Sequence, residues 1–154
     1  MSNSKVQSTV YPNLFHFVHQ TSSHKLPICS IHLYCDIGSS FETDELRGVA
    51  HFLEHMLFQG TKSKSSQVLF QEYDQIGSEF NAFTTKRYTC FYVKCHEMHG
   101  ERVLSLFEDM MKNSTMTKER VKKEKEVIKQ ENKNRSEDYR NVAQEAFDTL
   151  IYKN

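Results

Sequence analysis

The order of β-rich and helical runs is the feature of this sequence that most constrains its fold. Alternating runs predict strands over residues 13–20, 28–38, 79–85 and 88–95, and helical periodicity predicts helices over 44–58, 66–76, 99–113, 117–133 and 141–151. The strands and helices do not alternate strictly along the chain. The sequence therefore predicts an α+β fold in which helices pack on one face of a sheet.

Length and charge limit the class of protein. A chain of 154 residues can form one hydrophobic core, and no repeat or low-complexity block divides it, so we expect no internal boundary within residues 1–154. The 20 Lys and Arg residues balance the 20 Asp and Glu residues. Because this balance leaves no net field to attract polyanions, we expect neither nucleic acid nor a membrane as a partner.

The sequence contains no signal that would direct the chain into or across a membrane. It has no run of about eighteen apolar residues, the length that a membrane-spanning helix requires. Its first 20 residues contain no Arg and no apolar core of a signal peptide. A cytoplasmic location is therefore the default expectation.

The cysteines are expected to be buried free thiols. Neither neighbouring pair has the C-x-x-C spacing of a zinc knuckle or a redox motif; the four are Cys29, Cys35, Cys90 and Cys95. In "CSIHLYC" the two cysteines share the parity of the apolar residues of a predicted strand, where a reduced thiol behaves as a small hydrophobe. Without a secretory signal, free thiols are favoured over disulfides.

The stretch "GVAHFLEHMLFQGT", residues 48–61, places chemically active side chains on one side of a helix. At 100° per residue, His51, Glu54 and His55 share a face about 100° wide. The opposite face is apolar and is expected to pack on the sheet; it carries Leu46, Ala50, Leu53 and Leu57. The helix thus has one packing side and one polar side.

Two interpretations of this polar side remain open at this point. Histidines at positions i and i+4 can bind one metal ion, and a glutamate beside them can accept a proton from water on that metal, as in the H-x-x-E-H motif. The alternative is a polar helix face without a metal. A catalytic zinc site needs a third protein ligand, so the metal interpretation requires a further residue from another element.

The charged helix over residues 117–133 supplies candidates for that ligand. Five of its residues share an arc about 120° wide, and most of its lysines lie elsewhere; the five are Val121, Glu124, Val127, Ile128 and Glu131. A buried carboxylate is costly unless it is paired or binds a metal. Glu124 and Glu131 are therefore expected to face the core at or near the metal.

At this stage the sequence resembles the pitrilysin, insulysin and mitochondrial processing peptidase family, the zinc metallopeptidases with an inverted H-x-x-E-H motif (inverzincins). Three stretches carry the resemblance, "DIGSSFETDELRGVAHFLEHMLFQGT", "GSEFNAFTTKRYTCFYV" and "EKEVIKQE". Their order and spacing resemble the family from about residue 10 to the end of the sequence. The resemblance implies the first part of the family's first domain, with a mixed, largely antiparallel sheet.

The same resemblance implies the roles of the polar residues. His51, His55 and Glu131 correspond to the zinc ligands of the family, with one Zn²⁺ per chain, and Glu54 corresponds to its catalytic base. Glu124 corresponds to an acidic residue that supports the site, and a hydrogen bond to a zinc-binding histidine is a reasonable role for it.

The resemblance also implies a substrate site and its limits. Asn81 and Ala82 lie in the edge segment on which the family adds substrate as a β-strand. Family members are longer, with several related domains around a chamber, and their oxyanion-stabilising Arg and Tyr come from a later domain. Residues 1–154 are therefore expected to form a single partial domain.

The implied function is that of a zinc-dependent metalloendopeptidase, incomplete without further domains. Its expected partners are a peptide or protein substrate and a complementing peptidase domain or chain. The alternative is a catalytically silent fragment or homologue that binds zinc and either peptide or a partner subunit.

Overall fold

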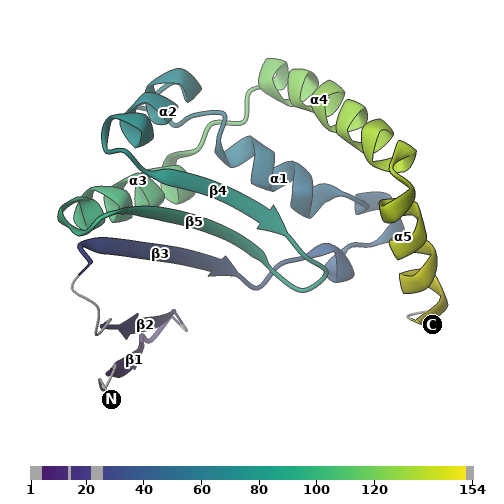
Figure 1. The fold of residues 1–154 in the computed structure, drawn as a ribbon. Helices are drawn as coiled ribbons and strands as arrows, with labels where there is room; N and C mark the ends of the chain where they lie inside the picture. The colour runs from purple at the N-terminus through teal and green to yellow at the C-terminus, as the bar shows by residue number, and fades with distance from the viewer. Residues whose placement is uncertain (1–4, 14, 22–25, 152–154) are drawn as a thin grey trace.

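A three-stranded antiparallel sheet lies at the centre of the computed structural model, which describes residues 5–13, 15–21 and 26–151 (Figure 1). Its strands are β3 (Ile28–Cys35), β4 (Glu79–Thr84) and β5 (Thr89–His96), in the order β3-β5-β4. All pairings between the described strands are antiparallel. The sheet is therefore antiparallel, and its described strands include no parallel pair of the kind that a mixed sheet contains.

The two faces of the sheet differ in burial. Along β3 the exposure alternates strictly, and the less exposed residues Cys29, Ile31, Leu33 and Cys35 pack against the core. This confirms the predicted parity. All four cysteines are free: Cys90 and Cys95 are buried, whereas Cys29 and Cys35 are only partly buried.

Helices cover one face of this sheet, as predicted. The helices that cover it are α1 (Val49–Leu57), α2 (Ser66–Gln75) and α3 (Gly100–Asn113), whereas α4 (Lys118–Glu137) packs on α1 and α5 (Tyr139–Ile151) contacts α4. The core forms where α2 and α3 meet β5; its buried residues are Leu69, Tyr73, Phe91, Val93, Cys95, Val103, Leu106, Phe107 and Met110. No helix among the described residues is long and apolar enough to span a membrane.

The N-terminal strands form a separate hairpin. β1 (Val6–Val10) pairs with β2 (His16–Gln20), and every residue of both strands is exposed. The run over 13–20 correctly predicted β2, although residue 14 lies outside the described residues. β1 was not predicted, because "VQSTV" has polar residues at its centre and buries no apolar face.

The helix predicted over 44–58 begins later than expected. A short 3₁₀ turn occupies Asp44–Leu46, and Gly48 then adopts a left-handed conformation with φ of 88°, so α1 starts at Val49. Its packing side also differs from the prediction, because Leu46 and Leu53 are 54% and 38% exposed. Ala50, Glu54 and Met56 are the buried residues of α1.

The last two predicted helices are longer than expected. α4 continues four residues beyond 133, to Glu137, and α5 already starts at Tyr139. At the other end of α4 the Thr117 side chain accepts a hydrogen bond from Arg120 N, which fixes the start of this helix. α4 then runs beside α1 (Figure 1).

A polar network anchors the loop after α1 to α3. Asp109 of α3 accepts hydrogen bonds from Thr61 Oγ1 at 2.9 Å, Asn113 Nδ2 at 2.9 Å and Lys64 Nζ at 3.2 Å. Burial alone would raise the pKa of Asp109, but these donors outweigh it and lower the pKa from its ordinary 3.8 to about 2. The network therefore holds a largely buried carboxylate in its charged form.

We expect Asp109→Asn to destabilise the fold by about 2 kcal/mol at neutral pH. Because the folded-state pKa is lowered, the stabilisation is complete above the ordinary pKa and is lost as the pH falls from about 4 to about 2. Urea unfolding at a series of pH values measures this. The difference in unfolding free energy between wild type and variant should shrink across that window, whereas the exposed Asp74→Asn control should show no such change. A difference that does not depend on pH would contradict the lowered pKa of Asp109 as the source of the stabilisation.

Candidate metal centre

The facing sides of α1 and α4 bring together four of the residues singled out from the sequence. His51 and His55 lie one helical turn apart on α1, with ring centroids 4.5 Å apart and ring planes at 85°. Their Nε2 atoms face each other at 3.0 Å. Glu124 and Glu131 approach them from α4. The polar face of α1 is thus directed at a second element, as a metal site requires.

The donor atoms of His51, His55 and Glu131 lie close enough together to hold one metal ion. The Glu131 Oε2 atom lies 3.5 Å from His55 Nε2 and 3.9 Å from His51 Nε2. A tetrahedral zinc ion with bonds of about 2.0–2.1 Å holds its ligand atoms about 3.3–3.4 Å apart. The three atoms all lie within 4.8 Å of one another. They form a triangle close to one face of such a tetrahedron, and we call His51 Nε2, His55 Nε2 and Glu131 Oε2 the ligand triangle.

Glu124 lies behind His55 and not at the ligand triangle. Its Oε1 atom is 2.8 Å from His55 Nδ1, and its Oε2 atom accepts a hydrogen bond of 2.6 Å from Gln59 Nε2. Because a carboxylate only accepts, we assign the ring hydrogen of His55 to Nδ1, which leaves the Nε2 lone pair directed at the triangle. The expected hydrogen bond between Glu124 and a histidine of α1 is therefore present, whereas its role in supporting a metal ligand stays a prediction.

The charge balance of the site favours a bound cation. Glu54 and Glu124 are only 8% and 5% exposed, and the Glu131 carboxylate lies 3.5 Å from His55 Nε2. Within the described part of the chain, the ion pairs include no Lys or Arg partner for any of these three carboxylates; the only partners are the two histidines. Buried carboxylates without a compensating positive charge are costly, so the donor set fits a divalent metal.

Glu54 is held between α1 and the end of β4. The Thr84 hydroxyl donates a hydrogen bond to its Oε2 atom. Thr84 also lies 3.3 Å from the hydroxyl of Thr89, which donates to the Ile37 carbonyl at 2.9 Å. Glu54 therefore has a fixed carboxylate with a neutral partner, next to His55 in the sequence.

A carboxylate cap fixes the start of the helix that carries these residues. The Glu42 Oε2 and Oε1 atoms accept hydrogen bonds from the backbone N–H groups of Gly48 at 2.7 Å and Ala50 at 2.8 Å. These N–H groups lie in the first turn of α1, where the helix itself offers them no acceptor. Glu42 thus fixes the first turn immediately before His51.

Asn81 and Ala82 lie on the edge strand β4. The Asn81 Oδ1 atom accepts a hydrogen bond of 2.8 Å from Ala82 N. This backbone N–H is therefore satisfied by the neighbouring side chain and not by β5. Among the described residues, no hydrogen bond or ion pair joins Asn81 or Ala82 to the ligand triangle.

The core-facing arc of five residues predicted on α4 is only partly correct. Glu124 is buried and Val121 and Ile128 are partly buried, but Val127 is 40% exposed and the side chain of Glu131 is 47% exposed. The expectation that Glu131 faces the core is wrong, because α4 crosses α1 so that Glu131 reaches the histidines from the solvent side.

Two residues of the site were missed by the sequence analysis. Thr84 belongs to the quoted stretch "GSEFNAFTTKRYTCFYV", and strand alternation places it on the same face as Ala82, which could have identified it. Gln59 lies four residues after His55 and therefore on the same side of the helix. Neither residue type draws attention by itself, since both are common in structural hydrogen bonds.

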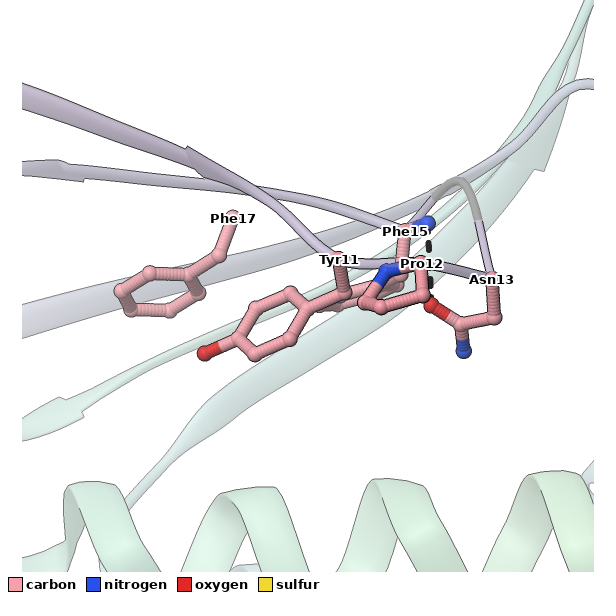
Figure 2. Close-up of a pocket in the computed structure, with 5 residues that line it drawn as sticks. All are labelled: Tyr11, Pro12, Asn13, Phe15 and Phe17. Carbon is pink, nitrogen blue, oxygen red and sulfur yellow. Dashed lines mark hydrogen bonds between the residues drawn. The ribbon is translucent and has the colours of Figure 1, made fainter.

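A surface hollow on the N-terminal hairpin is separate from this centre. Figure 2 shows its described lining, which consists of Tyr11, Pro12, Asn13, Phe15 and Phe17. These residues include no carboxylate, imidazole or thiol, and their hairpin lies well away from α4 in Figure 1. The hollow therefore offers apolar surface but no catalytic group.

Comparison with known families identifies a match over most of the chain. Residues 17–154 match the sequence model of the family described as "Insulinase (Peptidase family M16)". An uncharacterized zinc protease of Bacillus subtilis, YmxG, is 42% identical over 102 residues, which are 66% of this chain and 25% of that protein. A probable mitochondrial-processing peptidase subunit beta of Arabidopsis thaliana is 33% identical over 131 residues, 85% of this chain and 24% of that protein.

Two further similarities extend this comparison. Cytochrome b-c1 complex subunit 1 of Rattus norvegicus is 31% identical over 146 residues, 95% of this chain and 29% of that protein. The crystal structure of a protease from Helicobacter pylori superposes with a TM-score of 0.81 at 24% identity, over 86% of this chain and 32% of that one, which supports the fold. The chain thus spans about a quarter to a third of the length of these proteins.

Proposed function

The chain belongs to the insulinase family of peptidases (M16), and we propose that it is the zinc-binding part of a metalloendopeptidase. In this proposal His51, His55 and Glu131 bind one Zn²⁺ per chain, Glu54 is the catalytic base and Glu124 supports His55. Residues 1–154 act as a single partial domain of the catalytic unit.

The ligand triangle is the observation that carries this proposal. Two imidazole nitrogens and one carboxylate oxygen lie 3.0–3.9 Å apart, on either side of the about 3.3–3.4 Å between the ligand atoms of a tetrahedral zinc ion. Three protein ligands leave a fourth position for water or substrate, which is typical of a catalytic and not a structural zinc site.

The residues around the triangle suit peptide hydrolysis. A bound zinc ion would supply Lewis-acid activation of water and of the scissile carbonyl. Glu54 accepts a proton from the attacking water and donates it to the leaving amine. Since the Thr84 hydroxyl binds Glu54 Oε2, we expect Oε1 to be the oxygen that accepts the proton.

The edge strand β4 is the proposed site for the substrate backbone. A peptide added to this edge would pair with main-chain groups of the strand, while Asn81 and Ala82 position it near the metal. The Ala82 N–H becomes available to the peptide once the Asn81 side chain turns away from it. The substrate is therefore expected to be a peptide or protein in an extended conformation.

Other parts of the catalytic unit lie outside this chain in the proposal. Because the chain spans only a fraction of its relatives, we expect oxyanion-stabilising donors to come from a complementing domain or chain. The relatives named as subunits of larger complexes favour such a partner. The cytoplasmic location expected from the sequence stays a prediction.

A catalytically silent relative is the second candidate. The rat relative named as a cytochrome b-c1 complex subunit, similar over 95% of this chain, favours it, because that name describes an assembly component and not a protease. In this alternative the chain binds zinc and either peptide or a partner subunit without hydrolysis.

Metal analysis combined with a peptide-cleavage assay tests the proposal. The purified chain is expected to contain about one zinc per chain, and to cleave a mixed peptide library when the remaining domains of a family member are added. Zinc without cleavage under both conditions would favour the silent alternative. No zinc at neutral pH would contradict both candidates.

A further inference from the structure

Gln59 contacts the metal centre from just beyond the end of α1. It lies two residues after Leu57 and four residues after His55, and its backbone N–H donates to the Met56 carbonyl at 3.1 Å, which continues the helical turn. Its side-chain amide donates to Glu124 Oε2 at 2.6 Å. Gln59 and His55 therefore hold the two oxygens of one carboxylate from the same side of α1.

On the basis of the zinc-binding function proposed above, we propose that Gln59 is a positioning residue of the metal centre. By fixing the Glu124 carboxylate, it keeps Oε1 against His55 Nδ1 and thereby keeps His55 Nε2 directed at the metal. Gln59 touches neither metal nor substrate in this role and acts only through Glu124 and His55.

The burial of Glu124 makes the Gln59 contact necessary. Glu124 is 5% exposed, so water cannot readily replace a lost hydrogen-bond donor. In the part of the chain that the structure describes, the Glu124 oxygens have two donors, His55 for Oε1 and Gln59 for Oε2. Without the amide, Oε2 would be a buried charged acceptor without a donor. The carboxylate would then lower its free energy by rotating toward water.

Rotation of Glu124 would release His55. An imidazole whose Nδ1 hydrogen is bound by a carboxylate has a fixed tautomer and ring orientation, and its other nitrogen becomes a better metal ligand. If the acceptor moves away, Nδ1 and Nε2 can exchange the hydrogen, and the fraction of His55 that presents a free Nε2 lone pair decreases. Zinc affinity should decrease with it.

The neutral charge of the glutamine also matters. A Lys or Arg at this position would offset the charge of Glu124 and weaken its effect on His55. The amide provides a hydrogen bond without a charge, so the full negative charge of Glu124 continues to act on the imidazole. Gln59 therefore suits a supporting carboxylate better than a cationic side chain of similar reach.

Zinc affinity and the histidine tautomer together test this role. Gln59→Met keeps the side-chain length and removes the donor, and Gln67→Met on the exposed side of α2 is the matched control. We expect Gln59→Met to weaken zinc binding, measured by competition with a chromophoric chelator, by about tenfold, the lower end of the cost of losing an outer-shell partner. The control should bind zinc as the wild type does.

The tautomer is measured on the metal-free protein by two-bond ¹H–¹⁵N correlation, at a pH where the imidazoles are neutral. His55 should carry its hydrogen on Nδ1 in the wild type and exchange it between both nitrogens in Gln59→Met. Gln59→Lys, which retains a donor to Oε2, should keep the His55 hydrogen on Nδ1, but its positive charge should leave zinc binding weaker than in the wild type. Gln59→Met could instead lower the melting temperature and leave both the tautomer and the zinc affinity as in the wild type. That result would show that Gln59 only packs, and it would overturn the proposal.

These outcomes separate the positioning role from the proposed function. If the wild type binds no zinc, the proposed function fails, but the tautomer comparison still decides whether Gln59 positions His55. If the wild type binds zinc and Gln59→Met matches it in both measurements, the positioning role fails and the proposed function stands.

Discussion

Glu54→Gln is expected to lower peptide cleavage by about 10²–10⁴-fold while zinc stays bound. Glutamine has the shape of glutamate, and its amide oxygen can still accept the hydrogen bond of the Thr84 hydroxyl. It cannot accept a proton from the attacking water. The measurement is kcat/KM on a peptide that the complemented chain cleaves, together with the zinc content of each protein.

Glu126→Gln is the matched control for this substitution. Glu126 lies on the exposed side of α4, where it pairs with Lys129 at 2.7 Å, and it has no contact with the ligand triangle. Its replacement should leave both cleavage and zinc content unchanged. Retention of wild-type cleavage by Glu54→Gln would exclude Glu54 as the base.

His55→Ala is expected to abolish stoichiometric zinc binding. His55 is the most connected residue of the centre: its Nε2 atom lies 3.0 Å from His51 Nε2 and 3.5 Å from Glu131 Oε2, and its Nδ1 atom lies 2.8 Å from Glu124. Loss of a direct ligand should weaken binding by more than about 10²-fold, which exceeds the cost of losing an outer-shell partner. Titration with a competing chelator measures the change.

A second variant separates metal loss from misfolding. His55→Ala leaves the buried Glu124 without one of its donors and can therefore destabilise the fold. His51 has a more exposed side chain, at 39%, so His51→Ala should lose zinc while the metal-free protein keeps its melting temperature. His19→Ala, on the exposed strand β2, should retain zinc. Wild-type zinc affinity in both His51→Ala and His55→Ala would contradict the assigned ligands.

The side of each helix on which the polar residues lie could be predicted from the sequence. Helical geometry placed His51, Glu54 and His55 on one face, and the structure turns the two histidines toward α4 and Glu54 toward the end of β4. Glu124 and Glu131 shared a predicted face for the same reason. Periodicity alone is sufficient for such predictions because residues three and four apart on a helix are neighbours.

Which glutamate meets the Nε2 atoms of the two histidines could not be predicted from periodicity. Glu124 and Glu131 lie two turns apart, and the crossing of α4 over α1 decides that Glu124 reaches His55 Nδ1 whereas Glu131 reaches Nε2. That crossing is tertiary information. The hydrogen bond from Thr84 to Glu54 depends in the same way on where β4 ends beneath α1.

Local backbone geometry explains the error at the start of α1. The apolar pattern from Asp44 onward suits a continuous helix, but Gly48 takes a left-handed conformation and the Glu42 carboxylate binds the N–H groups of Gly48 and Ala50. A side-chain cap from six residues upstream leaves no periodic signal. The predicted helix was therefore too long at this end.

Zinc K-edge X-ray absorption on the purified chain tests the central claim most directly. We expect one zinc ion with nitrogen and oxygen neighbours at about 2.0–2.1 Å, including the multiple-scattering signal of two imidazoles. The alternative ligands would be thiolates, such as those of Cys29 and Cys95, which are paired directly across β3 and β5. Sulfur neighbours at about 2.3 Å, or a chain that binds no zinc, would contradict the assignment of His51, His55 and Glu131.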